Sequence, residues 1–156
     1  MPAKRHPSLI PLSHDHHHGL VLAFRLREGL PRSRRPGDNP QGQAADTVRF
    51  FHNNLVAHFR AEEEVLFPAV RACVPHAVTM LNTLVAEHGE MRAQVETLAH
   101  ASPDDVTLQT RLKAFADLLE RHIRREERGL FPLYEAHISE VDAALIGKDI
   151  ARITNK

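Results

Sequence analysis

A stretch that occurs twice decides the fold: HFRAEEEVLFP at residues 58–68 and HIRREERGLFP at residues 122–132. Seven of the eleven positions are identical: the histidine, the arginine, two glutamates and the closing Leu-Phe-Pro. Each copy sets a histidine four residues before a glutamate, His58 before Glu62 and His122 before Glu126. Residues four apart share one face of a helix, so the imidazole and the carboxylate reach the same metal ion, and a carboxylate can also bridge two ions. The repeat therefore predicts two helices facing each other across a metal site inside a helical bundle.

The composition is that of one soluble domain, residues 1–156, with 42% hydrophobic and 26% charged residues. Lysine plus arginine equals aspartate plus glutamate, 20 against 20, so no global field draws the chain to nucleic acid or to an anionic membrane. The apolar runs are too short to span a bilayer, and the first residues lack the apolar region of a signal peptide. The single cysteine, Cys73, suits a reducing compartment, so we expect a cytoplasmic protein. Histidine is the outlier at twelve residues.

Apolar residues recur at helical spacing in four segments, and no segment shows sustained alternation. We expect an all-α fold with helices at about 13–30, 44–73, 76–99 and 104–137, and a short helix at about 139–153 that begins after Ser139. Ser13 is the expected N-cap of the first helix. The expected apolar face of that helix comprises Leu20, Val21, Ala23, Phe24 and Leu30. Residues 31–43, rich in proline, glycine and arginine, are expected to form an exposed loop.

Pro68 and Pro132 lie inside the second and fourth segments. Each lacks a backbone N–H and presses on the carbonyl four residues earlier, so the helix is expected to kink or stop there. A simple helix breaker is the plainer interpretation. The recurrence of both prolines at the same distance from the His–Glu pair favours a shared structural role.

Two further helices offer histidine ligands. His88 lies on the same side of its helix as Leu84, Met91 and Val95. A lone histidine on an apolar face is more often a core residue, but beside two His–Glu pairs we expect it to be a ligand. The first helix opens with His14-Asp-His-His-His18. We take Leu20 as the centre of the buried face of this helix. At about 100° per residue around the helix axis, His16 and His17 then lie roughly 40° and 60° to either side of Leu20.

We favour His16 because Asp15-His16 resembles Glu87-His88, while His17 stays an alternative and both can bind. The expected metal ligands are His16, His17, His58, Glu62, His88, His122 and Glu126. His14 and His18 point away from the expected face. An incidental, solvated histidine run is the competing interpretation of this segment.

Other repeated residues are expected to surround the site. Glu63 and Glu127 lie about 100° round from the ligand glutamates, where they support the ligands or face solvent. Arg60 and Arg124 are expected in ion pairs on the solvent side. Four further histidines have no partner at ligand spacing and are expected at the surface or at helix ends: His52, His76, His100 and His137.

The donor set limits the metal. Imidazole with bridging carboxylate suits iron, manganese or zinc, and the absence of thiolate donors disfavours copper(I) and iron–sulfur clusters. A structural zinc site closes with four ligands, whereas six or more are offered here. Buried carboxylates without a metal would be costly, which is the physical reason to expect that Glu62 and Glu126 bind one.

A histidine on the first and third helices and His-x3-Glu on the second and fourth resembles the hemerythrin-like, or HHE cation-binding, family over nearly the whole chain. The resemblance implies an up-down-up-down four-helix bundle, here about residues 13–137, with two iron ions bridged by two carboxylates and an oxo or hydroxo group. Family members bind O2 reversibly or serve iron handling, redox sensing or protection against oxidative and nitrosative stress. Ferritin-like di-iron proteins, with Glu-x-x-His, are the less favoured alternative.

The chain departs from hemerythrins proper at two places. They place a second histidine four residues after the third-helix ligand, where this chain has Arg92. They also use His-x4-Asp on the fourth helix, where this chain has His-x3-Glu. One iron is therefore expected to keep an open or water-filled position unless His17 fills it. This disfavours O2 carriage relative to sensing, peroxide chemistry or metal binding.

Three functions compete at this point. The first is a binding or sensing module whose di-iron site takes O2, NO or a small anion, and we favour it because no separate substrate motif is present. The second is an enzyme that reduces peroxide, O2 or NO at the same irons. The third is a helical interaction protein with incidental histidines, whose only candidate contact is the loop arginines Arg32, Arg34 and Arg35. Basic loops without interleaved aromatic residues are usually just solvated.

Overall fold

The protein is described by a computed structural model, which covers residues 4–28 and 39–156. Within these residues the regular secondary structure is entirely helical, which confirms the all-α class. The first helical run is η1 (Pro7–Leu9) followed by α1 (Ile10–Glu28). The second consists of α2 (Pro40–Phe50), η2 (Phe51–Leu55), α3 (Val56–Ala61), η3 (Glu62–Leu66) and α4 (Phe67–Cys73). The third is η4 (Pro75–Ala77) with α5 (Val78–Ala99). The fourth is α6 (Leu108–Arg125), η5 (Glu126–Leu130) and α7 (Phe131–His137), and α8 (Glu140–Thr154) follows.

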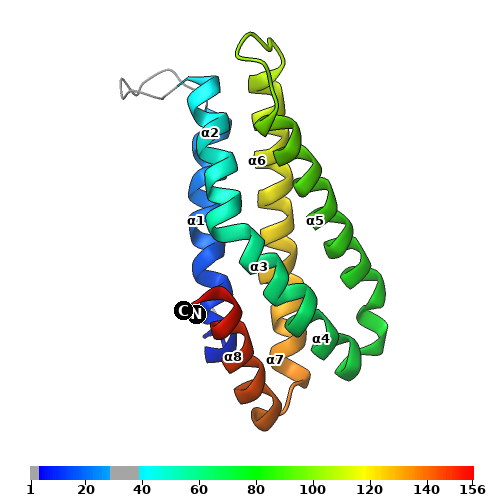
Figure 1. Ribbon diagram of the computed structural model, residues 1–156. Coiled ribbons are helices and arrows are strands. Elements are labelled where there is room, and N and C mark those ends of the chain that lie inside the picture. Colours follow the sequence, from blue (N-terminus) through cyan, green and yellow to red (C-terminus); the bar gives the residue numbers. More distant parts are fainter. Residues whose placement is uncertain (1–3, 29–38) are drawn as a thin grey trace.

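These runs lie alongside one another (Figure 1). The helix α1 packs along α6, α5 packs along α6, and α2 contacts both α5 and α6. The last helix, α8, packs against α3, η3 and η1. Elements from every part of the described chain thus surround the middle of the molecule, where the repeated stretches lie.

Three predicted helix starts were wrong, two of them because a different residue provides the cap. The first helix begins before Ser13, since the His6 side chain accepts a hydrogen bond from the Ser8 backbone in η1. The second begins at Pro40, inside the predicted loop, because Asn39 caps it through the Gly42 N–H. The fourth begins at Leu108 rather than near 104.

The Asp105 side chain explains the late start of the fourth helix, because it accepts the Thr107 N–H and keeps this segment in a turn. The cap of the last helix was predicted correctly: the Ser139 hydroxyl accepts the Asp142 N–H. Residues 29–38, which include Leu30, the loop arginines and most of the predicted loop, lie outside the described residues.

Both prolines follow a π-helical turn. The turn η3 begins at Glu62 and η5 begins at Glu126, and Pro68 and Pro132 each occupy the second position of the α-helix that comes next. A π-turn widens the hydrogen-bond ladder by one residue. A proline directly after it falls where the missing N–H matters least, as at a helix start. The helix therefore continues past each Leu-Phe-Pro, and Figure 1 shows that its direction changes between α2 and α4. The prediction of a shared structural role is confirmed.

Two clusters of buried apolar side chains lie at opposite ends of the long helices. One cluster includes Leu22, Leu26, Phe51, Phe59, Met91 and Phe115. The other includes Leu9, Leu12, Leu66, Leu81, Phe131 and Tyr134. The repeated histidines and glutamates of the second and fourth helical runs lie where one cluster gives way to the other.

The predicted apolar face of α1 was partly wrong. Val21 and Phe24 are 48% and 60% exposed, and only Ala23 of the predicted residues in the described part is fully buried. The buried face combines other apolar residues, Leu12, Leu22 and Leu26, with the polar residues Asp15 and His16 and with Gly19. A Cβ at Gly19 would lie 2.9 Å from Ile123 Cδ1 of α6, so the glycine permits the close approach of α1 and α6.

Candidate metal centre

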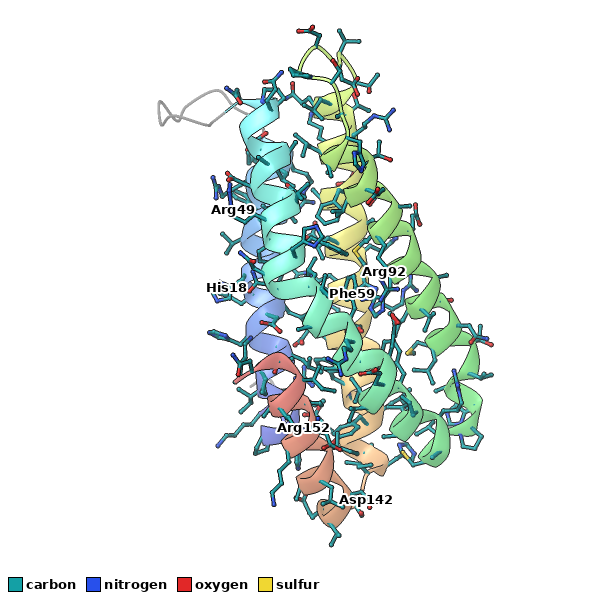
Figure 2. All side chains as sticks on the ribbon, in the orientation of Figure 1. His18, Arg49, Phe59, Arg92, Asp142 and Arg152 are labelled. Atoms are coloured by element: carbon teal, nitrogen blue, oxygen red, sulfur yellow. The ribbon has the colours of Figure 1, made fainter. Side chains whose placement is uncertain are left out.

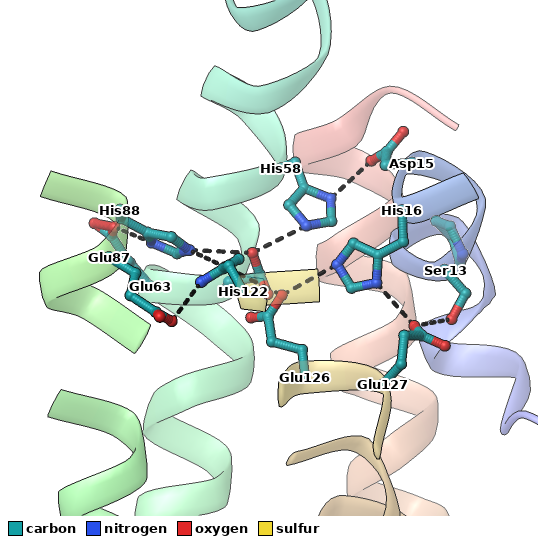
Figure 3. A network of polar contacts seen from close by, with 12 residues as sticks. Ser13, Asp15, His16, His58, Glu63, Glu87, His88, His122, Glu126 and Glu127 are labelled. Carbon is teal, nitrogen blue, oxygen red and sulfur yellow. Dashed lines mark hydrogen bonds and ion pairs between the residues drawn. The ribbon is translucent and has the colours of Figure 1, made fainter. Parts of the chain in front are cut away.

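Six buried side chains from all four helical runs converge in the middle of the molecule (Figure 3). One group comprises His16, His58, Glu62 and Glu126, whose ligand atoms lie within 4.8 Å of one another. The other comprises Glu62, His88, His122 and Glu126, within the same limit. Each group therefore has two imidazoles of its own, and both glutamates belong to both groups. This is the arrangement of donors that two neighbouring cations with bridging carboxylates require.

The repeated His–Glu pairs provide the geometry along the helices. His58 Nε2 lies 3.0 Å from Glu62 Oε1, and His122 Nε2 lies 3.2 Å from Glu126 Oε1. Two histidines reach across from the other helices. His16 Nε2 is 3.1 Å from Glu126 Oε1, and His88 Nε2 is 3.4 Å from Glu62 Oε1. Every imidazole of the site thus directs Nε2 inward.

Every imidazole also directs Nδ1 to a carboxylate outside the centre. His16 Nδ1 is 2.8 Å from Glu127, and His88 Nδ1 is 2.7 Å from Glu63. The two acids follow Glu62 and Glu126 in sequence. Of the two predicted alternatives, contact with the clustered histidines or exposure to solvent, the structure shows the contact.

Asp15 and Glu87 provide the other two supports, 3.0 Å from His58 Nδ1 and 3.0 Å from His122 Nδ1. Sequence reasoning missed this role, although the Asp-His and Glu-His dipeptides signalled it. Asp15, which precedes His16 on α1, holds His58, and Glu87, which precedes His88 on α5, holds His122. Such carboxylate–histidine contacts fix the tautomer and orientation of metal ligands.

A third tier of cations neutralises the outer carboxylates. Arg92 Nη2 lies 2.9 Å from Glu63, Arg125 Nη2 lies 3.4 Å from Glu87, and Arg5 Nη2 lies 3.2 Å from Glu127. The Lys156 ammonium pairs with Asp15. All four histidines of the centre are therefore anchored through a carboxylate to a cation nearer the surface.

The outer carboxyls are ionised. Burial raises the pKa of Asp15, Glu87 and Glu127, but hydrogen bonds from the imidazoles outweigh it, and the net shift is downward. The hydrogen bond from His88 likewise lowers the pKa of Glu63. Ionised carboxylates only accept hydrogen bonds, so each Nδ1 carries the proton, and in a neutral imidazole Nε2 is left as a lone pair.

When the imidazoles are neutral, their Nε2 lone pairs consequently face one another in the centre. His88 Nε2 lies 3.1 Å from His122 Nε2. Both carboxylate oxygens of Glu62 and one of Glu126 are buried without a hydrogen-bond partner among the described residues. With neutral imidazoles and an ionised Glu62, the short N···O distances to Glu62 do not relieve this, because an Nε2 lone pair donates nothing. Buried, unsatisfied acceptors are costly, and cations in their midst would satisfy them. The donor set therefore fits a pair of metal ions.

In place of metal ions, protons can satisfy these buried acceptors. Burial and the nearby charge of Glu126 raise the pKa of Glu62 to about 8. Burial disfavours the charged form of His122, but the charge of Glu126 and hydrogen bonds to Glu126 and Glu87 outweigh it and raise the His122 pKa to about 10. Burial also works against Glu126, but the His122 charge holds the Glu126 pKa well below its usual range.

The remaining histidines lie outside the centre. His17, the alternative to His16, is exposed and belongs to neither ligand group, because the buried face of α1 runs through Asp15, His16 and Gly19 rather than about Leu20. The histidines expected at the surface are exposed: His14, His18, His52, His76, His100 and His137. Arg60 forms the expected solvent-side ion pair, with Glu64, and Arg124 lies 3.6 Å from Glu120.

Residues 8–134 match the hemerythrin HHE cation-binding domain over most of the chain. The chain belongs to this family. A protein of Nostoc sp. (strain PCC 7120) named DNA nickase is 34% identical over 88 residues, which are 56% of this chain and 24% of that protein. The chain therefore spans about a quarter of the length of this relative. No solved structure matches the chain significantly. Among the described helices, none is long and apolar enough to cross a membrane.

Arg92 stands where hemerythrins proper have a further histidine. Its side chain does not enter the centre, because it is bonded to Glu63 and lies 5.7 Å from the Phe59 ring centroid. In this member of the family the position thus serves to anchor the carboxylate behind His88.

Proposed function

We propose that this protein binds two iron ions, with manganese or zinc as alternatives, and takes O2, NO or a small anion at that centre. One ion is assigned to His16 and His58, the other to His88 and His122, and Glu62 and Glu126 bridge them. The roles we expect are sensing, iron handling or stress protection. In keeping with its family, we assign the four long helical runs to an up-down-up-down bundle.

The sharing of Glu62 and Glu126 by both ligand groups is the observation that supports this proposal. Two anionic bridges offset part of the charge of two divalent ions in a site from which water is excluded. Iron would supply redox chemistry and affinity for small diatomic ligands. With two imidazoles and two shared carboxylates for each ion, coordination positions stay open, as in other non-haem iron sites.

Elemental analysis joined to optical spectroscopy tests the proposal. Purified protein is expected to contain about two iron ions per chain, and the spectrum of reduced protein should change on exposure to air and again with azide. Protein that takes up no iron, and shows no ligand-dependent absorption after anaerobic reconstitution, would contradict it.

The second candidate is an enzyme that reduces peroxide, O2 or NO at the same centre. The observation in its favour is that Arg92 faces outward and offers no ligand, so the centre has fewer histidines than in hemerythrins proper. Steady-state consumption of peroxide or NO with a reductant would favour the enzyme. Stoichiometric binding without turnover would favour the binding protein.

We propose that the chain has neither a nucleic-acid nor a membrane partner and acts in the cytoplasm. The name of the Nostoc relative raises DNA as a partner, but only 24% of that protein is matched. Acidic and basic residues are equal in number in this chain, so a general attraction to phosphate is not expected. Gel-shift and nicking assays with the metal-loaded protein test this directly.

A further inference from the structure

Another pair of imidazoles lies on the outward face of α1, away from the candidate metal centre. His14 and His18 are four residues apart, and both are exposed. Their ring centroids are 4.8 Å apart and their planes meet at 88°. His18 points outward from α1 in Figure 2. In the described part of the chain, no hydrogen bond or ion pair engages a ring nitrogen of either residue.

We propose that His14 and His18 chelate a divalent ion of the zinc, copper or nickel class, at a surface site separate from the buried centre. Side chains four apart on a helix stand one above the other on the same face, about 40° apart. Two imidazoles without a carboxylate suit these ions better than magnesium, calcium or manganese. The ring contact brings both residues within reach of one ion.

The backbone of this surface site is already ordered. The opposite face of α1 is buried, with Leu12 and Leu26 in the core and Gly19 in close approach to α6. Binding therefore orders two side chains and no backbone, which keeps its entropic cost low. Substitution at either exposed histidine should leave folding intact, since surface changes away from caps and cores rarely alter stability.

The test titrates protein whose buried centre is loaded with iron, using Zn2+ in calorimetry and Cu2+ in electron paramagnetic resonance. We expect about one further equivalent, with copper coupled to two nitrogens. His14→Ala or His18→Ala should weaken binding at least ~10-fold, because the second imidazole otherwise binds as an intramolecular ligand at high effective concentration. His52→Ala is the matched control, an exposed histidine that has no histidine four residues away.

Unchanged affinity in the double variant His14→Ala/His18→Ala would overturn the proposal, as would copper coupled to a single nitrogen. The outcome is independent of the function proposed for the buried centre. Glu62→Gln should lose the buried ions and keep the surface ion, whereas the double variant should lose only the surface ion.

Discussion

At the scale of residues, the candidate ligands differ in whether they belong to one of the two groups or to both. Glu62 belongs to both ligand groups and His88 to one. We expect Glu62→Gln to reduce the metal content from about two ions per chain to well below one, because it removes a charged bridge from both sites. His88→Ala should cost one ion only. Glu64→Gln is the matched control, since Glu64 lies on the same turn but is exposed and paired with Arg60. Metal-to-protein ratios after gel filtration measure all three. Equal losses for Glu62→Gln and His88→Ala would show that Glu62 is not a bridge.

The protonation of single residues predicts how metal affinity depends on pH. Burial disfavours the charged form of His122, but the charge of Glu126 outweighs it and raises the His122 pKa to about 10. Burial raises the Glu62 pKa to about 8. In the metal-free protein at pH 7, His122 therefore carries a second ring proton and Glu62 is protonated. A metal ion must displace these protons, and protons become scarcer as the pH rises. Apparent metal affinity should therefore increase from pH 6 to pH 8, with proton release on binding. A pH indicator in weakly buffered solution measures the release. Metal uptake without proton release would contradict the conclusion that His122 and Glu62 are protonated in the metal-free protein.

At the scale of helical elements, two glycines in α1 and α5 should respond in opposite ways. Gly19 lies against Ile123 of α6, so Gly19→Leu is expected to lower the free energy of unfolding by about 1–3 kcal/mol through overpacking. Gly89 faces open space on α5, so Gly89→Ala should raise it by about 0.5–1 kcal/mol through helix propensity. Urea denaturation of the metal-free protein measures both. A destabilised Gly89→Ala variant would mean that α5 has a neighbour on this face.

The helices also show how far sequence reasoning reaches. The doubled His-x3-Glu placed His58, Glu62, His122 and Glu126 on facing helices because i and i+4 spacing is a local property. The side of α1 that is buried, by contrast, depends on residues distant in the sequence. Its buried face follows from contacts of Asp15 and His16 with residues over forty positions away, and a count of apolar residues misplaced it toward Phe24.

The π-turns and the outer cations were equally hidden from sequence reasoning. A proline indicates that the backbone hydrogen-bond pattern of the helix is interrupted. It does not indicate that the helix forms a π-turn with one additional residue and then continues. Arg5 and Lys156 reach the site from opposite ends of the chain, a proximity that no spacing rule encodes.

At the scale of the whole molecule, the two halves of the centre are anchored differently. Behind His16 and His58, the outer carboxylates of Glu127 and Asp15 pair with Arg5, which precedes η1, and with Lys156, which follows α8. Behind His88 and His122, the cations are Arg92 and Arg125, which are part of the long helices α5 and α6. Segments outside long helices open at a lower free-energy cost than helix interiors. The ion bound by His16 and His58 should therefore be the more labile one.

Chelator challenge of the protein with both ions bound tests this asymmetry. We expect metal release in two phases, with Arg5→Ala/Lys156→Ala accelerating the faster phase about 10-fold, the lower end of the effect of removing support behind metal ligands. The slower phase should change little in that variant, and Arg92→Ala/Arg125→Ala is the matched control that should accelerate only the slower phase. His88→Ala, left with the ion on the α1 side, identifies the phases because its release should match the faster one. A single phase, or equal acceleration of both phases by either pair, would mean that the bridging glutamates couple the two ions so tightly that the outer anchoring no longer distinguishes them.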